Sequence, residues 1–166
     1  DGLATVGLAW MTVGLLGADS IARHLAKMLQ GFAPKILAYD PYPSEAMCAL
    51  GVEYVATPEE LFQGSDIVSI HTPLNEHTQG MVNAHLLGLL KPGAILVNTS
   101  RGSIIREGDL IDALKEGRLQ GAGLDVVSDE PVQKDNLLLH LPNAYVTTHI
   151  GASAYEAKLR VEQCLV

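Results

Sequence analysis

Short apolar runs alternate with stretches of helical periodicity along almost the whole chain. The runs are rich in Val, Ile and Leu and end at glycine or at a polar cluster, which is typical of strands buried in a parallel sheet. We predict strands at the following places: Met11–Gly17, Lys35–Tyr39, Asp66–Ile70, Ala94–Asn98, Leu119–Val126 and Ala144–Thr148.

The segments between these runs carry helix signals. Apolar residues recur at helical spacing from Ile21 onward, and Gly31 marks the end of that helix. Thr57, together with Pro58 and Glu60, forms a capping box at the start of a short helix. Further helices are predicted from Asn83 to Leu90, over Arg106–Glu116 with Gly117 closing it, and from a second capping box of Ser153 and Glu156 onward.

This alternation of strands and helices predicts an α/β fold. Right-handed helical crossovers between parallel strands build a doubly wound parallel sheet with helices on both faces. Such sheets bind ligands beyond the carboxyl ends of their strands. Polar residues gather at those ends here, at Asp19-Ser20, Asp40, His71-Thr72-Pro73, Asn98-Thr99-Ser100-Arg101, Asp125 and His149. The sequence therefore predicts a doubly wound ligand-binding domain.

Composition and charge narrow the range of partners. The chain has 166 residues, 48% hydrophobic and 18% charged, which suffices for one domain with a continuous core. It has no apolar run of about 18 residues, so the sequence contains no transmembrane helix. With 11 Lys and Arg against 19 Asp and Glu, the net charge is −8 and no basic block occurs. This balance argues against nucleic acid and anionic membranes as partners.

The cysteine and histidine positions do not indicate a metal site. Cys48 and Cys164 form neither a CxxC motif nor a metal-binding spacing, and His71 and His77 have no third ligand placed to close a site. Isolated thiols of this kind are typical of a reducing compartment. We therefore expect a cytoplasmic protein without a bound metal.

The first predicted strand leads into a glycine loop of the dinucleotide-binding type. The fingerprint G-x-G-x-x-G/A would occupy residues 17–22, where Gly17 supplies the tight turn and Ala22 the small residue for close packing. Asp40 ends the next strand about 20 residues further on, where a carboxylate accepts hydrogen bonds from ribose and repels a 2′-phosphate. No arginine follows it closely, so we expect NAD rather than NADP. The alternative for Asp40 is a turn residue before Pro41.

Asp19 departs from the fingerprint, because it occupies the position of the middle glycine. It adds a side chain and a negative charge where a pyrophosphate would approach the helix N-terminus. A like-charge pair near 4 Å costs on the order of 4 kcal/mol at an effective dielectric constant of about 20. The alternative is an ordinary helix-capping aspartate. The sequence leaves both interpretations of Asp19 open.

Several further motifs, taken in order, resemble those of one protein family. They are Ala38-Tyr39-Asp40-Pro41-Tyr42, residues 65–74 (SDIVSIHTPL), residues 91–102 (KPGAILVNTSRG), Gly123-Leu124-Asp125-Val126 with Asp129-Glu130-Pro131, and Pro142-Asn143 with His149-Ile150-Gly151. From Thr12 to its end, the chain resembles the cofactor-binding domain of the D-isomer-specific 2-hydroxyacid dehydrogenases, the group that includes D-3-phosphoglycerate dehydrogenase. The resemblance implies a Rossmann-type domain with NAD as cofactor.

The resemblance also implies a catalytic trio. Arg101 matches the arginine that holds the substrate carboxylate and carbonyl, a task that suits the planar guanidinium fork. His149 matches the acid or base that exchanges a proton with the substrate oxygen. Glu130 matches the glutamate that pairs with this histidine, fixes its tautomer and raises its basicity. Taken singly, each of the three could be an ordinary surface or strand-end residue.

Other positions are assigned to the cofactor by the same resemblance. Asp125 matches the aspartate that hydrogen-bonds the nicotinamide carboxamide, and a strand-end cap is the alternative for this residue. The remaining cofactor-binding positions are Gly17, Asp19, Ser20, Ile21, Asp40, Thr72, Pro73, Thr99, Ser100 and Gly151.

The domain organisation follows from the extent of the resemblance. We expect residues 12–166 to form the NAD-binding Rossmann domain and residues 1–11 to be a remnant or linker. Residues 1–10 lack the basic start of a signal peptide, and the first methionine is Met11, so we expect a fragment of a longer protein. Family enzymes carry a separate substrate domain built from segments on both sides of this one, and this sequence contains neither. Because no interdomain cleft can then close, we expect little activity from the chain alone.

The expected function is NAD-dependent hydride transfer between nicotinamide and a D-2-hydroxy acid or its 2-keto acid. The resemblance implies a small-molecule substrate and a homo-oligomeric parent protein. The alternative is a non-catalytic dinucleotide sensor or scaffold, since the same fold also serves corepressors. Asp19 favours this alternative, whereas the presence of Arg101, Glu130 and His149 favours the enzyme.

Overall fold

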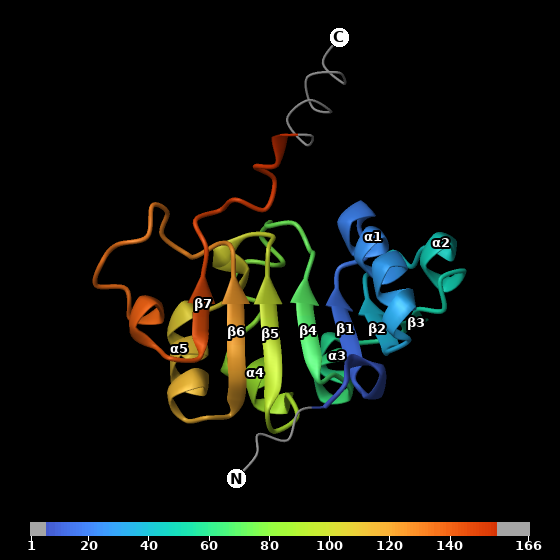
Figure 1. Ribbon diagram of the computed structural model, residues 1–166, viewed down its shortest axis with the longest axis horizontal. Coiled ribbons are helices and arrows are strands. Elements are labelled where there is room, and N and C mark those ends of the chain that lie inside the picture. Colours follow the sequence, from blue (N-terminus) through green and yellow to red (C-terminus); the bar gives the residue numbers. More distant parts are fainter. Residues whose placement is uncertain (1–5, 156–166) are drawn as a thin grey trace.

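The computed structural model describes residues 6–155, which form one parallel sheet flanked by helices (Figure 1). The sheet has seven strands in the order β3-β2-β1-β4-β5-β6-β7. The strands are β1 (Thr12–Leu16), β2 (Lys35–Tyr39), β3 (Glu53–Tyr54), β4 (Ile67–Ile70), β5 (Ala94–Asn98), β6 (Leu119–Leu124) and β7 (Ala144–Val146). β1 and β4 lie next to each other in the middle of the sheet. From β1 the strands are added toward one side, to β3, and from β4 toward the other, to β7. The prediction of a doubly wound parallel sheet is confirmed.

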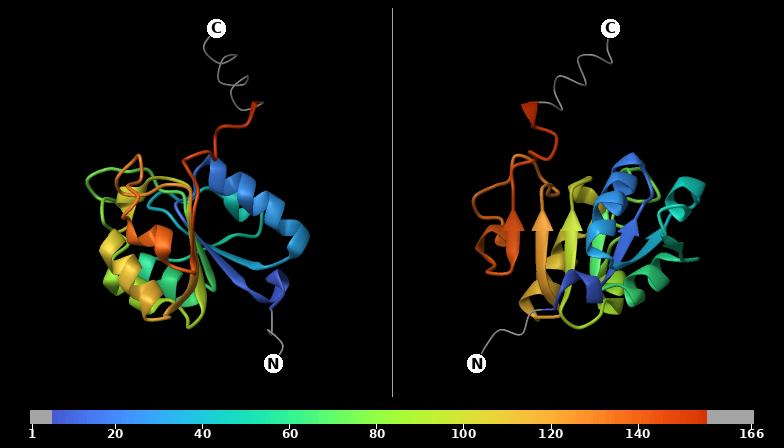
Figure 2. Two further views of the ribbon diagram at one scale, coloured as in Figure 1. Left: turned by 60° about the vertical axis from the view of Figure 1, so that its left-hand side comes forward. Right: turned by 45° about the vertical axis from the view of Figure 1, so that its right-hand side comes forward.

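The helices lie in layers on the two faces of the sheet (Figure 2). They are α1 (Ser20–Leu29), α2 (Glu45–Cys48), α3 (Pro58–Gly64), α4 (Ala84–Leu89) and α5 (Glu107–Lys115), with short 3-10 turns at Leu8–Trp10, Gln30–Phe32, Gly102–Ile104 and Leu137–His140. Helices α3, α4 and α5 share one hydrophobic cluster, and α1 and α2 share another. None of the helices within residues 6–155 has the length and apolar character needed to cross a membrane.

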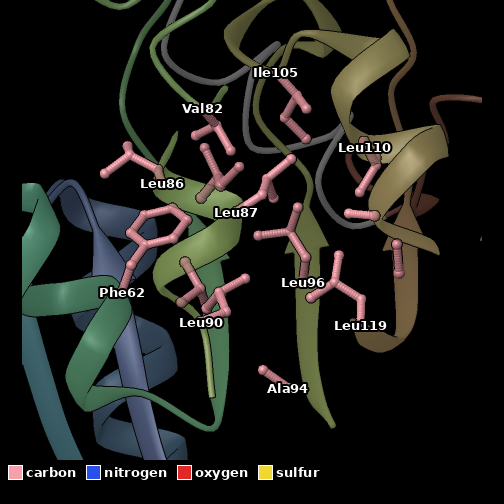
Figure 3. Packing of buried hydrophobic residues seen from close by; sticks show 14 of the residues in the cluster. Phe62, Val82, Leu86, Leu87, Leu90, Ala94, Leu96, Ile105, Leu110 and Leu119 are labelled. Carbon is pink, nitrogen blue, oxygen red and sulfur yellow. The ribbon is translucent and has the colours of Figure 1, made fainter. Parts of the chain in front are cut away.

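The larger cluster fixes the sheet to the layer of α3, α4 and α5 (Figure 3). Phe62, Leu87 and Leu96 are almost fully buried there and come from α3, α4 and β5. Each such side chain contributes about 1.5–3 kcal/mol when it is removed from water. On the other face Ala22 and Ala26 have no exposed surface, so their small side chains let α1 lie close to the sheet. The sheet is thereby a rigid base for the loops at its carboxyl edge.

The prediction of helices on both faces is confirmed, although within residues 6–155 the face that α1 and α2 cover carries no helix over β5, β6 and β7 (Figure 1). Buried and half-exposed residues alternate along β5, and Tyr145 on β7 is 72% exposed. The cause is the direction in which the sheet grows. Strands β4 to β7 are added one after another toward the same edge, so each right-handed crossover between them passes over the same face.

Most predicted elements agree with the structure to within a few residues. The strands predicted at Lys35–Tyr39 and Ala94–Asn98 are confirmed without change, whereas β3 and α2 lack a sequence signal because they are too short. The prediction that Gly31 ends the first helix is wrong. Helix α1 ends at Leu29 and continues as a 3-10 turn, and Ala33 makes the left-handed reversal at φ 53°. The second capping box involves Glu156, which lies outside the described residues.

Candidate functional site

The residues singled out from the sequence lie at the carboxyl edge of the sheet. This is expected, because the strands are parallel and each of these residues follows the end of a strand or opens the next helix. The structure places Gly17 after β1; Asp19, Ser20 and Ile21 at the start of α1; Asp40 after β2; Thr72 and Pro73 after β4; Thr99, Ser100 and Arg101 after β5; Asp125 and Glu130 after β6; and His149 and Gly151 after β7.

Gly17 makes the turn that brings β1 against the end of β4. Its φ is +97°, in the left-handed region, and its N–H donates to the carbonyl of Tyr39 at 2.9 Å. A Cβ built on Gly17 would lie 2.5 Å from the backbone nitrogen of Thr72. Only glycine tolerates both conditions. Glycine at residue 17 therefore lets the loop after β1 pass close to the end of β4.

Asp19 is the N-cap of α1. Its Oδ1 accepts a hydrogen bond from the Ala22 N–H at 2.8 Å, so its carboxylate already occupies one donor of the helix N-terminus. Asp40 is likewise engaged with the backbone, since its oxygens accept from Ala18 N–H and Tyr42 N–H, each at 2.8 Å. Asp19 therefore caps the helix and Asp40 bonds the turn that follows it, as the alternative interpretations of these two residues expect.

Asn98 shapes the loop that carries Arg101. It is fully buried, its Nδ2 donates to the carbonyl of Arg101 at 2.9 Å, and its Oδ1 accepts from the Ser100 N–H at 3.0 Å. Ser100 Oγ then donates to the carbonyl of Thr72 at 2.6 Å, which ties this loop to the end of β4. Asn98 lies in one of the sequence motifs described above, but no role was predicted for it. A buried polar residue at the end of an apolar strand was the available signal.

A pocket of about 440 Å³ opens between the loops that follow β1, β4 and β5. It is lined by Asp19, Ile21, Ile70, His71, Pro73, Leu74, Thr99, Ser100 and Arg101. The His71 ring hydrogen-bonds the Ser69 hydroxyl at 2.9 Å. Burial lowers the pKa of His71, and the charge of Asp19 only partly opposes this effect. His71 is therefore a neutral imidazole at neutral pH.

Glu130 and His149 form a hydrogen-bonded pair in a second pocket, of about 320 Å³, at the ends of β6 and β7. Glu130 Oε2 lies 2.7 Å from Nδ1 of His149, and Glu130 Oε1 accepts from the Val127 N–H at 3.2 Å. The hydrogen bond with His149 lowers the pKa of Glu130 and outweighs the opposing effect of burial. Glu130 is thus ionised at neutral pH and accepts the Nδ1 proton of the ring.

Helix α5 holds the segment that presents Glu130. Glu107, in its first turn, accepts from the Ser128 N–H at 3.0 Å and from Asn136 Nδ2 at 2.8 Å, so one carboxylate bridges both ends of the loop. Gly102 approaches the same loop so closely that a Cβ would lie 2.0 Å from the carbonyl carbon of Val127. The loops that carry Arg101 and Glu130 are therefore packed against each other.

Asp125 is buried, and its carboxylate is bonded to the segment that follows β7. It accepts from the Thr147 hydroxyl, from the Ile150 N–H at 3.0 Å and from the Gly151 N–H at 2.8 Å. Burial raises the pKa of Asp125, but these hydrogen bonds and the nearby His149 together hold it below its ordinary value. Asp125 is therefore ionised at neutral pH.

These residues fit a dinucleotide with one exception. The glycine turn at the strand reversal, the carboxylate of Asp40 and the open pocket along β4 and β5 are the features that such a ligand needs. The exception is Asp19, whose carboxylate lies where the helix N-terminus would meet the pyrophosphate. For a metal ion, residues 6–155 hold no group of three or more His, Cys, Asp or Glu side chains that could bind one.

Comparison with known proteins identifies the same fold and the same kind of domain. Residues 2–151 match the family described as D-isomer specific 2-hydroxyacid dehydrogenase, NAD binding domain. The chain is 42% identical over 153 residues to a glyoxylate reductase of Thermococcus litoralis, covering 92% of this chain and 46% of that protein. It is 40% identical over 148 residues to D-3-phosphoglycerate dehydrogenase of Methanocaldococcus jannaschii, covering 89% and 28%.

A solved structure agrees with these sequence relatives. The apo D-mandelate dehydrogenase of Rhodotorula graminis superposes with a TM-score of 0.90 at 35% identity, covering 95% of this chain and 46% of that one. The chain thus spans less than half the length of the relatives named here. The matched region includes the glycine turn, Asp40, Arg101, Glu130 and His149. The chain therefore belongs to the D-isomer-specific 2-hydroxyacid dehydrogenases, in their NAD-binding domain.

Proposed function

We propose that this chain is the cofactor-binding part of an NAD-dependent dehydrogenase that interconverts a D-2-hydroxy acid and its 2-keto acid. The observation that supports this most directly is the 2.7 Å contact between Glu130 and His149 at the carboxyl edge of a nucleotide-binding sheet. A histidine paired with an ionised carboxylate is a suitable acid and base near neutral pH.

His149 exchanges the proton in this proposal. Because Glu130 accepts the Nδ1 proton, the other ring nitrogen, Nε2, is left to donate to a carbonyl oxygen or to accept from a hydroxyl. The hydrogen bond that Nδ1 donates to Glu130 Oε2 fixes the tautomer and the orientation of the ring. When bound beside this pair, the reduced nicotinamide would supply the hydride to the substrate carbon and the oxidised form would accept it in the reverse reaction.

Arg101 binds the substrate in this proposal. Its Nη1 donates to the carbonyl of Ser100 at 2.7 Å, which holds the guanidinium beside the loop that Asn98 shapes. A guanidinium presents a planar fork of N–H donors that suits a carboxylate. Substrate oxygens between Arg101 and His149 would be oriented for proton exchange.

The cofactor is NAD rather than NADP in this proposal, because Asp40 places a carboxylate at the end of β2 where a 2′-phosphate would be repelled. The substrate class is a small 2-hydroxy or 2-keto acid. The relatives described above are named for glyoxylate, 3-phosphoglycerate and mandelate. We further propose a cytoplasmic, homo-oligomeric parent protein, with residues 12–166 as its NAD-binding domain.

A single-turnover assay tests this function. The chain is saturated with NADH, mixed with glyoxylate or hydroxypyruvate, and followed by absorbance at 340 nm. We expect slow oxidation that depends on the 2-keto acid and falls about 100-fold or more in His149→Gln, since a positioned acid contributes roughly 10²–10⁴. His85→Gln, on the outer surface of α4, is the matched control and leaves the rate unchanged.

Equal rates in His149→Gln and the unmodified chain would contradict this role of His149. The second candidate is a dinucleotide sensor or scaffold, which would bind NADH and for which His149→Gln would change no residual oxidation. One observation supports that second candidate, namely the Asp19 carboxylate bonded to the first turn of α1. Such a protein would bind a nucleotide at the carboxyl edge of the sheet without catalysing hydride transfer.

A further inference from the structure

His149 lies on an exposed segment with an unusual backbone conformation. Its φ is +56°, in the left-handed region, although it is not glycine. Residues 147–151 are all exposed to solvent, so burial contributes little to holding the segment in place. Left-handed non-glycine residues persist only where surrounding contacts impose them. Some group must therefore hold this segment where His149 meets Glu130.

Asp125 makes contacts on both sides of His149. Its backbone carbonyl accepts from the His149 N–H at 2.9 Å, and its carboxylate accepts from Thr147 Oγ1, Ile150 N–H and Gly151 N–H. Four hydrogen bonds thus run from one short segment to one residue. Only Thr148 in this segment makes none of them. Asp125 itself is buried at the end of β6. Its own N–H donates to the carbonyl of Asn98, which extends the pairing of β6 with β5 by one residue.

Gly151 is required for this arrangement. A Cβ on Gly151 would lie 2.9 Å from Oδ2 of Asp125, which is too close for a side chain unless the carboxylate moves. The segment can therefore wrap around the carboxylate only because residue 151 has no side chain. Contact with the Asp125 carboxylate is thus sufficient to account for a glycine at residue 151.

We propose that Asp125 is a positioning residue, whose carboxylate fixes the segment from Thr147 to Gly151 so that His149 directs Nδ1 at Glu130. The proposal rests on the proposed function for its consequence in catalysis, although the structural role stands by itself. It differs from contact with a nicotinamide amide, because the segment occupies three of the roughly four acceptor sites that a carboxylate offers.

The test compares Asp125→Asn with Asp109→Asn by NMR on the same chain. Asp109 also accepts a backbone hydrogen bond, from the Ala84 N–H at 2.7 Å, but this bond joins α5 to the start of α4 and not to residues 147–151. In Asp125→Asn we expect amide hydrogen exchange at Ile150 and Gly151 to become at least about tenfold faster. We also expect the ¹⁵N signals of the His149 ring to change from one fixed tautomer to an average of both. Asp109→Asn should change neither.

Glu130→Gln separates positioning from pairing. It should alter the ring signals of His149 but leave the exchange of Ile150 and Gly151 unchanged, because Asp125 still holds the segment. Unchanged exchange and unchanged ring signals in Asp125→Asn would overturn the proposal. If Asp125→Asn does not fold, Thr147→Val decides, since it removes one of the hydrogen bonds; faster exchange at Ile150 supports the proposal and unchanged exchange overturns it.

These measurements need no turnover, so they are independent of the proposed function. Loss of the His149 signature in Asp125→Asn, with no effect of His149→Gln on hydride transfer, would retain the positioning role and reject the catalytic one. The reverse pattern would retain catalysis by His149 and reject Asp125 as its anchor.

Discussion

Gly17 and Asp19 have opposite consequences for the loop that follows β1. Gly17 has the conformation and the close approach to Thr72 that the fingerprint requires. Asp19 replaces the glycine that would let a pyrophosphate approach, and its carboxylate bonds to Ala22 N–H instead. The loop therefore keeps the backbone path of a dinucleotide site but adds a negative charge to it.

Substitution of Gly17 tests the backbone part of this argument. We expect Gly17→Ala to lower the free energy of unfolding by at least about 2 kcal/mol, because a left-handed φ costs roughly 1–2 kcal/mol for a residue with a Cβ and the clash with the Thr72 backbone adds to it. Gly31→Ala is the matched control, since a Cβ there meets nothing within 4 Å. Urea unfolding measures both, and equal stabilities would contradict the account.

Single residues were predicted unevenly from the sequence. The resemblance of the motifs to one family pointed to Glu130 and His149, and these two side chains are in contact in the structure. The hydrogen bonds of Asp125 with Thr147, Ile150 and Gly151 could not be predicted, because they join residues that are brought together only when β6 and β7 are aligned. Those of Asn98 are local, to Ser100 and Arg101, but they depend on a loop path that the sequence pattern does not give. A sequence pattern gives the identity of a buried polar residue but not its partners.

At the scale of elements, the loop after β5 is organised by its own strand end. Asn98 bonds both Ser100 and Arg101, and Ser100 bonds the loop after β4. Two neighbouring strand ends are thereby joined without any contribution from a helix. The position of Arg101 is set by these contacts rather than by its own exposed side chain.

We expect Asn98→Ala to cost about 2–3 kcal/mol of unfolding free energy, because it removes both hydrogen bonds of a fully buried side chain. It should also weaken NADH binding, since the loop that lines the pocket loses its anchor. Asn143→Ala removes one hydrogen bond, to the Leu114 carbonyl, at the opposite edge of the sheet and should cost about 1 kcal/mol. Urea unfolding and NADH titration compare the two. An Asn98→Ala variant as stable as Asn143→Ala would contradict this role.

The elements that the sequence predicted well are those with a continuous apolar run or a strong cap. Thr57 accepts from the Glu60 N–H as the capping box requires, although Glu60 bonds Ala56 N–H rather than Thr57. The missed elements have no such signal. Strand β3 pairs with β2 through only Glu53 and Tyr54, and an edge strand of this length leaves no periodicity to detect.

At the scale of the whole molecule, the site is a consequence of topology. Strands β1 and β4 are neighbours at the sheet centre, and the strands that follow each of them are added in opposite directions. The parallel arrangement brings every strand-end cluster to one edge. The alternation of elements was sufficient to predict this. It was not sufficient to predict that β5 to β7 lack a described helix on one face, because that depends on the direction in which successive strands are added.

The central claim is that this edge binds NAD in spite of Asp19. Isothermal titration calorimetry with NADH and NADPH tests it on the unmodified chain, Asp19→Asn, Asp19→Gly and the control Asp109→Asn. We predict saturable binding of NADH and weaker binding of NADPH by the unmodified chain. We also predict about tenfold tighter NADH binding, or roughly 1.4 kcal/mol, in both Asp19 variants because a like charge near the pyrophosphate is removed. NADH binding that is absent from the unmodified chain, or that appears only when Asp19 is replaced, would contradict the account.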